Sequence, residues 1–208
     1  GFLVLVMVVM TGFFINLEIT KADEKNTENY HLIPWDDGQS GTYWMDGYLY
    51  WIDMKKKKIS RYSDEEMTKE EVLVEADKGT CIGECGLLYD DIIYYVLIDN
   101  KTHAGNLYSY NLKSRESNKL GAARELQRLE VLVDGKIYGC GYTKTGNPEV
   151  FLYDLKGKKL KQICKNGYFG QIVGKYIAIQ TISSSGKSGM TLYRKSDGQK
   201  IKTITSNC

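Results

Sequence analysis

The sequence predicts an all-β fold assembled from a repeated unit of four short strands. Turn signals recur at Asp46, Asp90, Asp134 and Gly174, which are 44, 44 and 40 residues apart, and an apolar strand follows each of them. The 208 residues include 16 Tyr and 21 Gly but only 2 Pro, a composition that favours strands joined by tight turns. A period of about 40–45 residues with four strands per unit is typical of a β-propeller blade.

Each repeat is predicted to contain the same elements in the same order. One strand precedes the turn signal, a second follows it, a third carries a tyrosine and a fourth closes the unit. The tyrosines are Tyr62, Tyr110, Tyr153 and Tyr193. Asp-Gly between apolar runs indicates a tight hairpin, because such turns need a positive φ. The repeats predict blades over approximately 41–76, 86–121, 129–165 and 169–205.

The blades are expected to pack face to face, because one four-stranded sheet cannot bury both of its faces. A β-sandwich is the rival architecture, but the common period favours the propeller. Four blades can close a small ring or belong to a larger one, since propellers have about four to eight blades. We favour an incomplete ring, because the chain begins with Gly and lacks a basic segment before its apolar start.

The first 19 residues are predicted to be a secretion signal or a membrane anchor, truncated at its N-terminus. Residues 1–14 carry no charge, but a bilayer-spanning helix needs about 20 apolar residues, so cleavage and anchoring both stay open. A buried strand or helix is the alternative for this segment. Residues 20–40 are polar and are predicted to form a linker, with one strand around Tyr30–Ile33. The propeller is expected to cover residues 41–208.

The first repeat carries a family resemblance. The segments LYWID at 49–53 and KISRY at 58–62 resemble the YWTD blades of low-density-lipoprotein-receptor-type propellers. The whole repeat region is similar to secreted bacterial propellers classed with that family. The other repeats have YYVL, YGCG and AIQT at the motif position. The resemblance implies that Trp51 and Asp53 tie neighbouring blades together, with ligand binding as the alternative.

No residue pattern indicates catalysis, a metal or a cofactor. The chain has five cysteines and two histidines, and their spacing does not supply the four ligands of a structural zinc site. A nucleophile needs a nearby His base and an orienting acid, and His103 lies in a predicted hairpin loop. We therefore predict no catalytic residues, no metal ligands and no cofactor.

The formal net charge of +2 conceals an uneven distribution. Residues 1–154 hold 17 basic and 25 acidic side chains, whereas residues 155–208 hold 11 basic and 1 acidic. A cationic C-terminal part can attract an anionic polymer. The alternative is protection of exposed sheet edges against aggregation by lysines on the closing strands. These lysines are Lys158, Lys159, Lys161, Lys200 and Lys202.

The predicted function is that of a non-enzymatic interaction module, secreted or held at the cell surface. The expected partner is a protein or an anionic cell-surface polymer, not nucleic acid, and the membrane is contacted only through the N-terminal segment. Propeller ligands bind at concave sites formed by loops. The loops at 76–86, 100–106, 121–128, 142–148 and 183–189 are therefore the expected binding face, with Trp44, Tyr89 and Tyr142 as aromatic candidates. The alternative is a fragment of a propeller-containing hydrolase or lyase whose catalytic residues lie outside this chain.

Overall fold

The computed structural model describes most of the chain from residue 47 onward and short segments before it. The described residues are 4–5, 9–10, 13–14, 18–19, 30–33, 44–45, 47–53, 55, 57–64, 66, 68–143, 145–182 and 188–205. Side chains are not described in the strands before residue 20, nor at positions 44, 45, 182 and 205. Within the described ranges all regular secondary structure is β-strand, so the all-β prediction is confirmed.

Each predicted repeat forms an antiparallel sheet whose strands follow chain order. The first blade consists of β6 (Trp44–Met45), β7 (Tyr48–Asp53), β8 (Lys58–Tyr62) and β9 (Glu70–Glu75). The second consists of β11 (Gly86–Tyr89), β12 (Ile92–Asp99), β13 (Gly105–Asn111) and β14 (Glu116–Ala122). The third consists of β15 (Arg128–Val133), β16 (Lys136–Tyr142), β17 (Pro148–Asp154) and β18 (Lys159–Lys165). The fourth consists of β19 (Gly167–Val173), β20 (Tyr176–Ile182), β21 (Ser188–Arg194) and β22 (Lys200–Thr205).

Tight turns join the first two strands of the blades, as the Asp-Gly signals predict. In the third blade the turn residues Asp134 and Gly135 have φ angles of 48° and 65°. Both values lie in the left-handed region, which Gly and Asp adopt more readily than other residues. Gly47 and Gly174 occupy the corresponding turns with φ angles of 78° and 56°. The turn chemistry therefore sets the pairing of the first two strands.

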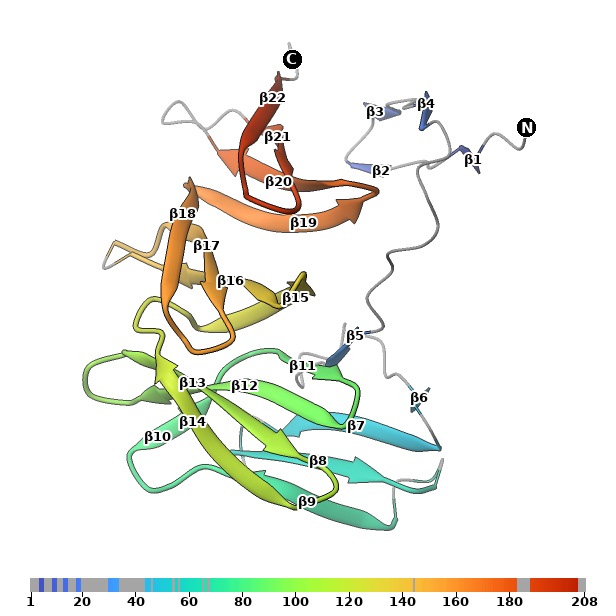
Figure 1. The fold of residues 1–208 in the computed structure, drawn as a ribbon, viewed down its shortest axis with the longest axis vertical. Coiled ribbons are helices and arrows are strands. Elements are labelled where there is room, and N and C mark those ends of the chain that lie inside the picture. The colour runs from blue at the N-terminus through green and yellow to red at the C-terminus, as the bar shows by residue number, and fades with distance from the viewer. Residues whose placement is uncertain are drawn as a thin grey trace.

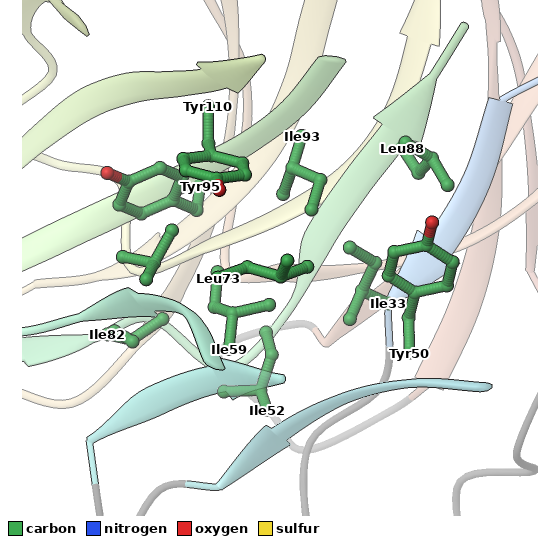
Figure 2. Close-up of a cluster of buried hydrophobic side chains, with 11 residues drawn as sticks. Ile33, Tyr50, Ile52, Ile59, Leu73, Ile82, Leu88, Ile93, Tyr95 and Tyr110 are labelled. Atoms are coloured by element: carbon green, nitrogen blue, oxygen red, sulfur yellow. The ribbon is translucent and has the colours of Figure 1, made fainter. Parts of the chain in front are cut away.

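Three hydrophobic clusters lie between successive blades. The first joins the first and second blades and contains Tyr50 and Tyr95 (Figure 2). The second joins the second and third blades, and the third joins the third and fourth. The repeated tyrosines Tyr110, Tyr153 and Tyr193 each belong to the cluster on the side of the preceding blade. Each blade therefore buries its third strand against its predecessor.

The four blades form an open arc (Figure 1). Figure 1 shows the first blade at one end and the fourth at the other, with the second and third between them. The fourth blade is correspondingly less buried. Most side chains of its strand β19 are exposed or half-buried, whereas those of the corresponding strand β15 are buried from Leu129 to Val133. A face without a neighbouring blade keeps its side chains in water, so the described blades do not close a ring.

Two further strands join the sheet of the second blade. The strand expected in the predicted linker is present as β5 (Tyr30–Ile33), which pairs antiparallel with β11. The segment 76–86, predicted as a loop, contains the strand β10 (Thr80–Ile82). The loop prediction is therefore wrong for these residues. β12 is eight residues long, β11 pairs with its first three residues, and β10 pairs with its last three.

The N-terminal residues form two short strand pairs. β1 (Val4–Leu5) pairs with β4 (Glu18–Ile19), and β2 (Val9–Met10) pairs with β3 (Phe13–Phe14). A search of the described residues finds no helix long and apolar enough to span a membrane.

The connection between the second and third blades lies directly over two glycines of β16. A Cβ on Gly141 would lie 1.6 Å from the carbonyl oxygen of Glu125, and one on Gly139 would lie 2.7 Å from that of Arg128. The Gln127 amide also donates a hydrogen bond to the Cys140 carbonyl, at 2.9 Å. The YGCG sequence, which departs from the YWTD pattern, is thus explained by close backbone packing.

An ionic network links β8 to β9 in the first blade. The Lys58 Nζ lies 2.5 Å from Glu70 Oε1, and the Ser60 and Tyr62 hydroxyls donate to the same oxygen at 2.7 and 3.1 Å. The bonds from Lys58 and Ser60 to the carboxylate lower the pKa of Glu70 to about 2. Burial and the Glu70 contact raise the pKa of Tyr62 to about 12.

The lowered pKa of Glu70 predicts an acid-dependent loss of stability. A carboxyl whose folded pKa is below its unfolded value stabilises the fold above the unfolded pKa, near 4.5, and loses this contribution as the pH falls toward 2. We expect Glu70→Gln to lower the free energy of unfolding by less than about 1 kcal/mol near neutral pH, because the pair is partly exposed. In urea titrations the difference from the parent should shrink steadily as the pH falls from 4.5 toward 2. Glu116→Gln on exposed β14 is the matched control, and an equal effect there would contradict the prediction.

Candidate binding face

The two ends of each blade differ in construction. Because neighbouring strands are antiparallel, the first strand starts where the second strand ends, as the pairing of Arg128 with Cys140 shows. The second-to-third and blade-to-blade connections therefore lie at one end, which we call the loop end. The first-to-second and third-to-fourth connections lie at the other, which we call the turn end.

All the loops expected to form a binding face belong to the loop end. The segments 100–106 and 142–148 join second to third strands, and 76–86 and 121–128 join successive blades. The segment 183–189 also joins a second strand to a third, but its residues 183–187 lie outside the described residues. The fold thus brings loops from different blades to one side of the arc.

A buried ion pair lies at the loop end of the third blade. Arg128 Nε is 2.6 Å from Glu130 Oε1, and an Arg128 terminal nitrogen is 3.6 Å from Glu84 Oε2. The Glu130 side chain is 7% exposed and the Arg128 side chain 30% exposed. Neither Arg128 Nε nor Glu130 Oε1 makes a hydrogen bond of regular geometry with the described residues. The contact is therefore an ion pair held by charge, since attraction between full charges needs no linear hydrogen bond.

Burial controls the protonation of this cluster. Desolvation raises the pKa of Glu130, and the Arg128 charge opposes this only in part. For Arg128, burial lowers the pKa but the Glu130 carboxylate outweighs it, so the net pKa is raised. Burial and the Glu130 charge also raise the pKa of the neighbouring Cys140 thiol, which stays protonated. A protonated thiol is a weak nucleophile, so Cys140 is a neutral neighbour of the ion pair.

Of the three aromatic candidates, Tyr142 adjoins this cluster. Burial and the Glu84 charge raise the Tyr142 pKa, while Arg128 lowers it. Tyr168, 40% exposed at the start of β19, acts on the same hydroxyl. These groups form a partly exposed aromatic and charged region at the loop end.

The other two candidates lie elsewhere. Tyr89 ends β11 at the turn end and packs half-buried against the cluster between the second and third blades. Trp44 is in β6 and pairs with Leu49, but its side chain lies outside the described residues. Tyr89 and Tyr142 therefore lie at opposite ends of their blades.

The buried ion pair of Arg128 and Glu130 was not predicted. Its signal was present in the segment RLEVLV, where Arg128 and Glu130 stand two residues apart in an otherwise apolar strand. Charges that alternate within an inner strand lie on one face of the sheet and must find partners. The third partner, Glu84, is 44 residues earlier in the chain, so only the tertiary structure identifies it.

Four of the five lysines predicted on closing strands lie on them, whereas Lys158 precedes β18. We define the basic flank as the exposed lysines on β18 and β22, namely Lys159, Lys161, Lys165, Lys200 and Lys202. Both strands are outer sheet edges. The Lys161 Nζ donates to the Gly198 carbonyl at 2.9 Å, which connects the two blades, and Lys159 pairs with Glu125. Exposed Leu160 and Ile201 lie between these charges.

Among the described residues, no three His, Cys, Asp or Glu side chains gather as metal ligands do. The four described cysteines, Cys81, Cys85, Cys140 and Cys164, are not joined by disulfides.

Comparison with known proteins identifies the fold. No family model matches the chain, and no curated protein matches it. A nidogen/laminin complex aligns with a TM-score of 0.50 and 10% identity over 77% of this chain and 60% of that chain. An oligogalacturonate lyase in complex with manganese aligns with a TM-score of 0.54 and 13% identity over 79% of this chain and 46% of that chain. Oligopeptidase B from Leishmania major aligns with a TM-score of 0.52 and 9% identity over 80% of this chain and 28% of that chain.

These likenesses define the protein as a β-propeller. At such low identity they show the fold alone. The chain spans less than two thirds of the length of each of these proteins. The activities in their names belong to those proteins.

Proposed function

We propose that this chain is a non-enzymatic interaction module that binds an anionic polymer or a protein at its loop end. The observation that carries the proposal is the convergence of connections from different blades at one end, where Arg128, Tyr142 and Tyr168 are partly exposed. Aromatic and arginine side chains are the usual anchors of binding surfaces. At the turn end, two-residue turns join the first and second strands of each blade, and such turns leave little room for specific recognition.

The charge distribution favours an anionic polymer as the ligand. The basic flank runs along two outer edges toward the loop end, and most of its charges have no acidic neighbour in sequence. A chain of carboxylates or phosphates can contact the flank and the loop end together. Edge protection by lysine explains the same residues without a ligand, so the two explanations must be separated by experiment.

Polygalacturonate is a suitable anionic probe. We expect Lys200→Glu/Lys202→Glu to weaken polygalacturonate binding at least about tenfold at low salt, because charge reversal removes attraction and adds repulsion. The matched control is Lys69→Glu/Lys113→Glu, which changes two exposed lysines of the acidic N-terminal part at the turn end and should change binding less than about twofold. Isothermal titration at rising salt measures both. Binding that is absent at low salt, or independent of salt, would contradict the electrostatic proposal.

A second comparison tests the loop end itself. Tyr142→Ser should weaken polymer binding, whereas Tyr89→Ser at the turn end should leave it unchanged. A thermal transition in each variant shows that both proteins are folded. If the two variants bind equally, the loop end is not the binding face.

The alternative is that the chain is part of a propeller-containing hydrolase or lyase. Two of the similar structures carry the names of such enzymes, a lyase and an oligopeptidase. This alternative places the catalytic residues outside the chain, so the full-length gene product is incubated with polygalacturonate, and the products are followed by ultraviolet absorption and by reducing ends. A lyase would create new double bonds and a hydrolase new reducing ends. Cleavage by the full-length product, or by the purified chain, would overturn the non-enzymatic proposal.

The proposed location is the cell surface or the extracellular space. It rests on the uncharged apolar segment 1–14 and on the resemblance of LYWID and KISRY to receptor-type blades. Fractionation of cells that express a tagged full-length gene tests it, because the tag should appear in the medium or in the membrane fraction.

A further inference from the structure

Each blade turns one face of its sheet toward the next blade and the other face toward the preceding blade. We call these the forward face and the backward face. Alternate side chains of a strand point to opposite faces of a sheet, so the hydrophobic clusters identify the two sets. In β17, Val150 and Leu152 belong to the cluster shared with the fourth blade. Phe151 and Tyr153 of the same strand belong to the cluster shared with the second blade.

The forward face of the fourth blade is apolar but is not part of any of these clusters. β21 aligns with β17 at the repeated tyrosine, so Leu192 corresponds to Leu152 and Met190 to Val150. Leu152 and Val150 are buried against the next blade. Leu192 and Met190 are only half-buried, as is Ile204, which lies opposite Met190 on β22. The fourth blade therefore presents a surface of the kind that the third blade buries.

The backward face of the first blade is the matching half of such a contact. Trp51 has the position that Tyr95 has in the second blade, where Tyr95 is buried against the first blade. Tyr62 likewise corresponds to the buried Tyr110. Trp51 and Tyr62 are half-buried, and neither belongs to any of the three clusters. Val72 lies in line with Trp51 across β8 and is exposed.

The two faces suit each other but belong to opposite ends of the chain. The first blade, residues 44–75, holds 8 acidic and 6 basic side chains, whereas the fourth, residues 167–205, holds 6 basic and 1 acidic. Figure 1 shows these blades at the two ends of the arc, so the faces do not meet within one chain. Two copies of the four-bladed arc supply eight blades, the upper end of the usual range of about four to eight, and three copies would exceed it.

We propose that two copies of this chain close one eight-bladed ring, in which the forward face of each fourth blade packs on the backward face of the other copy's first blade. A twofold axis relates the copies, so the same contact forms twice. Each contact repeats the packing that successive blades of one chain already make, and it brings a basic blade against an acidic one. The faces consist of strand residues rather than loops, so the proposal does not depend on polymer binding.

The test measures the mass of the 208-residue chain by sedimentation equilibrium. The parent should be a dimer at micromolar concentration, with twice the 23.7 kDa of one chain. Leu192→Asp on the forward face should raise the dissociation constant at least about tenfold, because it places a carboxylate in an apolar contact. Val72→Asp should do the same from the backward face. Leu160→Asp is the matched control, because it adds the same charge at an exposed leucine on the outer edge of the third blade, and it should dissociate like the parent.

A mixture of the two variants distinguishes this ring from other dimers. Leu192→Asp alone or Val72→Asp alone alters both contacts of the ring, but a mixed ring keeps one contact in which both faces are unaltered. At equal total concentration the mixture should therefore dimerise more tightly than either variant alone. No gain on mixing would show that forward and backward faces do not pair with each other and would overturn the proposal.

The remaining outcomes assign the faces to a different occupant or to none. A monomeric parent chain, or a dimer that both substitutions leave unchanged, would overturn the proposal. A monomeric full-length gene product with further blades would assign both faces to blades of the same polypeptide and likewise overturn it. If Leu192→Asp loses its thermal transition, Ile204→Asp on the edge strand β22 replaces it.

Discussion

Arg128→Met is expected to lower the free energy of unfolding by about 3–5 kcal/mol at neutral pH, because it leaves the buried Glu130 carboxylate without its partner. Glu130 is 7% exposed, and the same substitution also removes the Arg128 charge from beside the Glu84 carboxylate. Most of the loss arises from the uncompensated charge rather than from the pair itself. Urea denaturation followed by far-ultraviolet circular dichroism measures it.

The same variant should show a characteristic pH dependence. Burial already raises the pKa of Glu130 in the folded protein, and removal of Arg128 takes away the charge that opposes this. A carboxyl with a raised folded pKa binds its proton more tightly in the folded state, so its penalty appears as the pH rises above the unfolded value near 4.5. The deficit of Arg128→Met relative to the parent should therefore be smaller at pH 5 than at pH 7.5.

The double variant Arg128→Met/Glu130→Met is the control. It removes both charges and fills similar volume, and such replacements of buried pairs are often neutral or stabilising. We expect it to recover most of the stability lost by Arg128→Met and to lose the pH dependence. If the double variant is as unstable as the single one, the loss comes from packing around Arg128 and not from the buried carboxylate.

Gly141→Ala is expected to destabilise the protein by about 3 kcal/mol or more. The new Cβ would lie 1.6 Å from the Glu125 carbonyl oxygen and 2.8 Å from its carbon, and both atoms are backbone that cannot rotate away. The connection between the second and third blades would have to shift. For a chain of this length the loss corresponds to a fall in Tm of about 6–12 °C, which differential scanning calorimetry detects.

Gly146→Ala provides the comparison in the neighbouring loop. Gly146 has a φ of 79° but no atom within 4 Å of its hypothetical Cβ. The cost is then backbone strain alone, about 1 kcal/mol. Equal effects of the two substitutions would mean that the close approach over β16 does not constrain the fold.

The propeller architecture can be predicted from the sequence because the turn and strand signals that produce it are local and recur in each repeat. Asp134-Gly135 sets a tight turn, and the repeated tyrosines mark each third strand. In the second blade these local signals do not predict which strands pair. Nothing near Thr80 indicates that β10 would complete the pairing of the long strand β12. A strand was expected at Tyr30–Ile33, but its partner β11 lies more than fifty residues away.

The candidate site was less predictable than the fold. The loops of the loop end follow from the order of the strands, so the sequence places them together. The aromatic candidates were chosen by residue type alone, and strand direction places Tyr89 and Tyr142 at opposite ends of their blades. Charged partners such as Glu84 and Arg128 meet only when two blades pack side by side.

The repeated four-stranded unit, the turn at the head of each unit and the lysines along the outer edges can be predicted from the amino-acid sequence, because periodicity and turn chemistry are properties of neighbouring residues. Three other features become apparent in the folded chain alone. Glu130 is buried beside Arg128, Gly141 lies beneath the Glu125 backbone, and Ile33 is held on the edge of β11. Each depends on contacts between segments far apart in the chain, and no local pattern specifies such contacts.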